Sequence, residues 1–197
     1  HLWKKIGRLM TPVLFLTFFL FFVEAFFWTL APLYAETTNL KAFGSLFLTA
    51  YTLPALLVGW LVGSFTKRFG KKETAFVGVL IGSLVLSSFA YLPDSTVSII
   101  AVFVASVFIS MSLPAINSAY ADYISESPQV EGEIEGLEDF AFNIGYVAGP
   151  ISAGILADFF SIPVAFSILG LIGVVLASIL LLVTPDNINI KMKPSEL

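Results

Sequence analysis

Six long apolar blocks divide this chain, and its charged residues lie between them. Each block has roughly 19 to 25 residues, which as a helix rising about 1.5 Å per residue can cross a hydrocarbon core of about 30 Å. Only helices and closed barrels satisfy every backbone group in lipid, and continuous apolar runs without alternation favour helices. The sequence therefore predicts an all-α integral membrane protein in a lipid bilayer. The expected helices cover about 12–34, 42–66, 74–92, 96–120, 137–160 and 163–184.

The residue composition narrows the function classes. Of 197 residues, 57% are hydrophobic and 12% charged, too few polar groups for a soluble domain of this length. There is no cysteine and one histidine, at position 1, and no two carboxylates share the middle of a membrane block. Thiol nucleophiles, cysteine or histidine metal clusters and Ser/His dyads are excluded. We expect no enzyme, no metal and no cofactor.

The basic residues predict the orientation of the helices. Nine of the ten fall on one side of a six-pass topology, and only Lys41 falls on the other. The positive-inside rule then places both termini in the cytoplasm. We expect a cytoplasmic lead-in at 1–11, a transmembrane domain at 12–184 and a cytoplasmic tail at 185–197 of a plasma-membrane protein.

Between the fourth and fifth blocks lies a strongly acidic segment. Residues 122–139 contain seven acids and no Lys or Arg. One interpretation is a solvated loop with a short amphipathic helix. The other is a partner for the basic link 67–72 on the same membrane face, where a network of weak surface pairs could bias a gate.

A glycine-rich basic turn joins the second and third blocks. Gly63 would let a neighbouring helix approach closely, and Gly70 would permit the positive φ of a tight turn. Its cations are Lys67, Arg68, Lys71 and Lys72. Taken alone, they could serve only as a topology signal.

This turn resembles a loop signature of the major facilitator superfamily, Gly-x-x-x-Asp-Arg-x-Gly-Arg-Lys, which follows the second helix of each six-helix half. The positions Gly63, Arg68, Gly70, Lys71 and Lys72 match in kind, while Lys67 stands where the family usually has Asp. The resemblance implies a gating or structural role for the turn and a fold that is one half of a twelve-helix bundle, built as an inverted repeat of three plus three helices.

The fifth block carries a second pattern similar to that family, with Gly145, Gly149, Pro150 and Gly154. The glycines would form a groove for helix packing and the proline would kink the helix. An ordinary glycine-rich packing helix is the alternative. No charge lies in the fourth block, where first halves often have Arg, so the resemblance implies the second half, with a preceding six-helix half in the same polypeptide.

Glu24 is the ionisable side chain that lies deepest in a block. A charge there costs several kcal/mol, so such residues usually face a bundle interior or an aqueous cavity. Thr17 and Trp28 share its helical face at spacings of seven and four. We expect these residues to line a transport path, with Glu24 in proton coupling or solute binding; a hydrogen-bonded structural Glu is the alternative.

Small polar side chains in other blocks are further candidates for the path. They are Tyr51 in the second block, Ser106, Ser110 and Asn117 on one face of the fourth, and Asn143 and Tyr146 in the fifth. Such residues also bridge helices.

Two functions fit these features. The first is secondary active transport of a small solute by alternating access, with protons as a candidate coupling ion. The second is a six-helix structural or regulatory membrane subunit that binds no solute. Nothing in the sequence resembles the selectivity filter of a channel.

Overall fold

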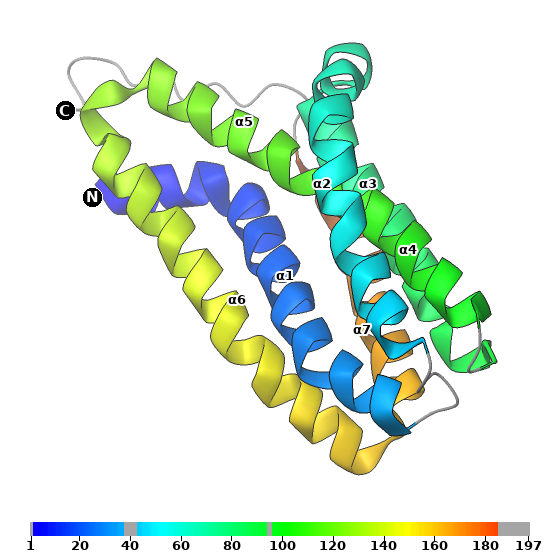
Figure 1. The fold of residues 1–197 in the computed structure, drawn as a ribbon. Helices are drawn as coiled ribbons and strands as arrows, with labels where there is room; N and C mark the ends of the chain where they lie inside the picture. Colours follow the sequence, from blue (N-terminus) through cyan, green and yellow to red (C-terminus); the bar gives the residue numbers. More distant parts are fainter. Residues whose placement is uncertain (1, 38–42, 94–95, 185–197) are drawn as a thin grey trace.

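The computed structural model describes residues 2–37, 43–93 and 96–184, and in these ranges the chain consists of helices joined by short turns, without strands (Figure 1). The α-helices are α1 (Leu2–Thr37), α2 (Gly44–Phe69), α3 (Lys71–Ser87), α4 (Thr96–Ser110), α5 (Ser112–Glu126), α6 (Glu131–Phe159) and α7 (Ile162–Val183), with 3₁₀ turns at Phe89–Tyr91 and Pro128–Val130. Six stretches are long and apolar enough to cross a membrane. The expected all-α architecture with six membrane spans is confirmed.

The first helix begins earlier than the apolar block. α1 starts at Leu2 and so includes most of the 1–11 lead-in, although the apolar span within it begins at Met10. The 185–197 tail, with Lys191 and Lys193, and the external Lys41 lie outside the described residues.

The fourth block is two helices rather than one. α4 ends at Ser110 and α5 begins at Ser112, with Met111 between them. Pro114 supplies no amide hydrogen to the carbonyl of Ser110, four residues earlier, and its ring crowds that carbonyl. The helix breaks there, and α5 leans away from α4 toward the start of α6 (Figure 1).

The acidic segment is more helical than either interpretation required. α5 continues to Glu126, a 3₁₀ turn follows, and α6 begins at Glu131, six residues before the expected start. Glu131 and Glu133 lie in the first turn of α6. Carboxylates are favourable at a helix N-terminus, so these acids favour a helix that starts within the segment.

Two helix pairs form the body of the bundle, α6 along α1 and α7 along α3 (Figure 1). Glycines allow the close approach. A Cβ at Gly149 would lie 2.7 Å from the carbonyl oxygen of Phe22, and one at Gly145 would lie 2.6 Å from that of Phe18. In the second pair, a Cβ at Gly170 would lie 2.7 Å from the carbonyl oxygen of Ser83. Neither pair leaves room for a side chain at these positions.

Gly63 and Gly154 behave differently from these packed glycines. A Cβ at either position would meet no described atom within 4 Å. The close approach that we expected at Gly63 is therefore absent within the described part of the chain, because Gly63 lies on the outer side of α2. Among the glycines of α6, Gly145 and Gly149 lie against α1. The helix continues through Pro150 to Phe159.

Gly70 joins α2 to α3 with a φ of 92°, the positive φ that we expected for this turn. Immediately after it, Lys71 Nζ lies 2.5 Å from Asp122 Oδ2 and donates to the carbonyl of Ser118 at 3.1 Å. The turn, the start of α1 and the link from α5 to α6 lie at one end of the bundle (Figure 1). The Lys71–Asp122 ion pair thus joins the basic turn to the acidic segment.

The outer faces of the bundle are apolar. Leu56 and Trp60 on α2 are 79% and 78% exposed, and Phe159 on α6 is 79% exposed. Inside, the rings of Phe26, Phe47, Phe89 and Phe166 are fully or almost fully buried. An apolar surface around an apolar core is the pattern of a protein dissolved in lipid.

Candidate functional site

A pocket of about 260 Å³ lies between α1, α2, α4 and α5. Glu24 and Trp28 line it from α1, one helical turn apart, and both side chains are partly exposed. The α1 helix brings them to one wall because residues four apart lie on the same face. The remaining lining residues are Leu20, Phe21, Tyr51, Thr52, Ala55, Ser106, Ile109, Ser110, Leu113 and Pro114.

The Glu24 side chain is half-buried and lines the pocket together with Tyr51 of α2. No Lys or Arg lines the pocket among the described residues. The pocket therefore holds one acid, hydroxyl groups and aromatic rings, and this wall lacks a countercharge of its own.

Tyr51 is fixed in place from two sides. Ser106 on α4 donates a hydrogen bond of 2.5 Å to its backbone carbonyl. The ring of Phe27 stacks on the Tyr51 ring at 3.9 Å between centroids, and Trp28 meets it edge-on at 6.2 Å. These contacts hold an aromatic corner beside Glu24.

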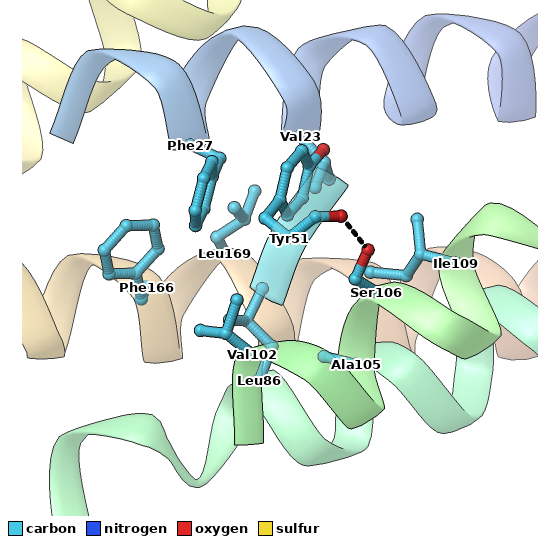
Figure 2. A pocket seen from close by; sticks show the side chains of 10 residues that line it. All are labelled: Val23, Phe27, Tyr51, Leu86, Val102, Ala105, Ser106, Ile109, Phe166 and Leu169. Atoms are coloured by element: carbon cyan, nitrogen blue, oxygen red, sulfur yellow. Dashed lines mark hydrogen bonds between the residues drawn. The ribbon is translucent and has the colours of Figure 1, made fainter. Parts of the chain in front are cut away.

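Behind this corner lies a small apolar cavity of about 20 Å³ (Figure 2). Figure 2 shows Tyr51 and Ser106 joined by their hydrogen bond on one side, with Phe27, Phe166 and Leu169 around the rest. The space could hold one water, but its walls offer almost no polar partners, so we expect it to stay dry. It separates the pocket from the α3–α7 pair.

The break between α4 and α5 opens into the pocket. Ser110 and Pro114, on either side of the break, both line it. The carbonyl of Ser110 lacks the amide partner that a residue other than proline would supply at position 114. An interrupted helix in a membrane is tolerated where its backbone faces protein or a cavity, and both conditions are met here.

The path candidates from the sequence divide into two groups. Five of them, Glu24, Trp28, Tyr51, Ser106 and Ser110, meet at the pocket. The other four, Thr17, Asn117, Asn143 and Tyr146, do not line it.

Three of the residues outside the pocket differ in their surroundings. The hydroxyl of Thr17 is buried and shares a hydrogen bond of 2.9 Å with that of Tyr120, which joins α1 to α5. Asn143 is exposed and donates to the carbonyl of Asp139 in its own helix. Asn117 is exposed on α5.

None of the loop-signature residues lines the pocket. Gly63, Lys67, Arg68, Gly70, Lys71 and Lys72 lie at the end of α2 and the start of α3. The guanidinium of Arg68 lies 5.3 Å from the centroid of the Phe69 ring. The basic turn and the pocket are thus two separate features of the molecule.

Sequence reasoning missed Phe21 and Phe27 as parts of the site. Phe21 lines the pocket and packs against Phe142 at 4.3 Å between ring centroids, and Phe27 stacks on Tyr51. The chain has twenty phenylalanines. Nothing in the sequence marks these two, although Phe21 and Glu24 are separated by one helical turn.

Comparison with known proteins gives two matches. A family model described as Major Facilitator Superfamily matches residues 13–195. The uncharacterized MFS-type transporter YuxJ of Bacillus subtilis (strain 168) is 30% identical over 134 residues, which is 65% of this chain. That alignment spans 32% of the relative, so this chain corresponds to a minor part of its length.

Proposed function

This chain belongs to the Major Facilitator Superfamily, and from that premise we propose that it carries out secondary active transport of a small solute by alternating access. One observation carries the proposal: a partly buried acid, Glu24, faces a pocket of about 260 Å³ that is lined by three membrane-spanning segments. Ionisable groups at such depth are costly and mark solute or ion pathways.

The pocket is proposed as half of the solute site. In transporters built from two six-helix halves, the site lies near the bilayer midplane, where the halves meet. The matched relative is about three times as long as the segment aligned to it, which supports a partner half in the same polypeptide. The exposed apolar sides of α2 and α6 leave ample surface for such packing.

Glu24 is proposed as the coupling residue. A bare carboxylate is expensive in a low-dielectric surrounding, so a proton or a polar or positively charged group of the solute must neutralise it. Tyr51 lines the same pocket. Exchange of a proton for the solute at one carboxyl would couple the two movements.

The orientation rests on the basic residues. We place the Gly70 turn and the acidic segment at the cytoplasmic face of the plasma membrane, because the turn carries four cations and positive charge favours that side. The Lys71–Asp122 pair then forms on the cytoplasmic side of α3 and α5. In this orientation it would help to hold that end of the bundle in one of its two arrangements.

The test is proton movement by the full-length protein in liposomes that contain a pH-sensitive dye. A panel of sugars, amino acids, organic cations and organic anions is added one at a time at equal concentration. We expect at least one class to change the internal pH, and Glu24→Gln to abolish that change because an amide cannot carry the proton. The matched control is Glu36→Gln, an exposed acid at the far end of the same helix.

Two results bear directly on the role of Glu24. Loss of the pH response in Glu24→Gln, with Glu36→Gln like the wild type, supports it. Unchanged rate, affinity and pH dependence in Glu24→Gln would remove Glu24 from the mechanism.

A further inference from the structure

An apolar groove on the other side of α2 is larger than the pocket. It has a volume of about 600 Å³ and lies between α2, α3 and α4. Phe65 and Phe69 line it near the Gly70 turn, and Val58, Ile81 and Val107 line it deeper in the bundle. Glu73 is its one charged lining residue among the described residues. Its walls are otherwise suited to hydrocarbon.

The groove has the depth of one membrane leaflet. From Phe69 to Val58 is eleven residues of helix, about 16 Å at 1.5 Å per residue. From Lys71 to Ile81 is ten residues, about 15 Å. Half of a hydrocarbon core of about 30 Å is the same length. An extended acyl chain that enters at the turn would end near the middle of the membrane.

A basic residue lies at the mouth of the groove. Arg68 is exposed at the end of α2, whereas Lys67, one turn after Gly63, lies on the outer face of that helix. The guanidinium of Arg68 lies over the Phe69 ring, which is itself part of the groove wall. Of the nearby charges, Lys71 is paired with Asp122, and Glu73 is the one acid of the turn. Positive charge thus stands where a lipid headgroup would lie.

We propose that this groove is a binding site for a single anionic phospholipid, whose acyl chain fills the space between α2, α3 and α4 and whose phosphate lies against Arg68. Basic residues at a membrane surface attract anionic lipid headgroups. The apolar wall accounts for the chain, and the cations account for the choice of headgroup. The site does not depend on the proposed transport function, because it shares no lining residue with the pocket.

The test uses the full-length protein in mild detergent with equal amounts of phosphatidylglycerol and phosphatidylcholine that carry identical acyl chains. Native mass spectrometry then counts the lipid retained per protein. We expect one phosphatidylglycerol to be retained in preference to phosphatidylcholine. Each basic residue at a lipid surface contributes a factor of about five, so K67Q/R68Q, which removes two of them, should lower the preference about 25-fold.

A matched pair of substitutions on α2 tests the groove itself. Leu61→Trp places an indole in the groove, and Leu56→Trp places one on the outer face, which is not part of the groove. We expect Leu61→Trp to lower the retention of both lipids several-fold and Leu56→Trp to leave it unchanged. The K67Q/R68Q variant changes surface groups alone and serves as the second test if Leu61→Trp fails to fold.

Three results would overturn the proposal. Equal retention of the two lipids would mean a general lipid contact. Equal behaviour of the two tryptophan variants would place the lipid elsewhere. Loss of retention in Leu61→Trp without any effect of K67Q/R68Q would mean a groove for hydrocarbon that does not recognise the headgroup.

Discussion

Two hollows flank α2, and their walls differ in chemistry. The pocket on the α1 side has a carboxyl, hydroxyls and an interrupted helix, whereas the groove on the α3 side is apolar with a basic mouth. The helices behind them are held in the same way, by glycines that bring α6 onto α1 and α7 onto α3. The packing is therefore similar on both sides. The two hollows differ in chemistry because of the side chains on α2 and α4 and because of the helix break at Met111.

The pocket and the groove therefore have different tasks in this account: the pocket binds solute and the groove binds lipid. Polar groups inside a membrane are costly, so they are kept to the hollow where a solute would pass. The groove avoids that cost and faces lipid. If the division is correct, changes on one side should leave the other side intact.

The largest effects should come from the glycines behind each hollow. Gly149→Leu would drive a side chain into the backbone of α1, and Gly170→Leu would do the same to α3. Overpacking of this kind costs about 3 kcal/mol, seen as a lower midpoint of thermal unfolding in detergent. Gly154→Leu, which meets open space, is the matched control and should change little.

The same two variants, Gly149→Leu and Gly170→Leu, test whether the pocket side and the groove side act independently. Where they still fold, Gly149→Leu should impair solute-driven proton movement and spare lipid retention, and Gly170→Leu should do the reverse. If both variants lose both properties equally, the two sides do not act independently.

A smaller effect is expected at the hydrogen bond between α2 and α4. Ser106→Ala removes the donor to the Tyr51 carbonyl. Interhelical hydrogen bonds in membranes average about 0.6 kcal/mol, so solute affinity should fall about two- to threefold through movement of the aromatic corner. Titration of the proton response with solute measures this change. Lipid retention equal to that of the wild type is expected, and a loss there instead would assign Ser106 to the groove side.

The smallest effect should come from the ion pair at the basic turn. Lys71 and Asp122 have side chains that are 36% and 57% exposed, and exposed pairs contribute between about 0 and 1 kcal/mol. A double-mutant cycle with Lys71→Gln and Asp122→Asn should give a coupling energy in this range that falls as salt is raised. Lys67→Gln, in the same turn, should show no coupling to Asp122→Asn. A salt-independent coupling of several kcal/mol would instead indicate a buried lock.

Much of the fold could be predicted from hydropathy and spacing. The six spans follow from the apolar blocks, and the spacing of four between Glu24 and Trp28 placed both on one wall of the pocket. Thr17 lies on the same face of α1 but outside the pocket, because α5 crosses there and brings Tyr120 to it. That crossing depends on the break at Met111, which hydropathy does not reveal.

The glycine patterns in the sequence did not distinguish the glycines that pack against another helix from those that are open. Gly63 and Gly154 belong to the family patterns, yet both are open, whereas Gly78 and Gly82, with the spacing of a GxxxG pair, pack tightly against α4. A single sequence shows where glycines occur but not which helix faces them. The two hollows likewise depend on how α2 leans on α4, which no local pattern encodes.

The most direct test asks which hollow contains water. These 197 residues contain no cysteine, so Ser110→Cys in the pocket and Val107→Cys in the groove can each be a single reporter on α4 in a cysteine-free full-length protein. A charged, membrane-impermeant methanethiosulfonate reacts with the thiolate, which forms in water and not in hydrocarbon. We predict rapid modification of Ser110→Cys and slow modification of Val107→Cys, with equal rates after denaturation. Equal rates in the folded protein, or faster reaction at Val107→Cys, would contradict a solute path on the α1 side of α2.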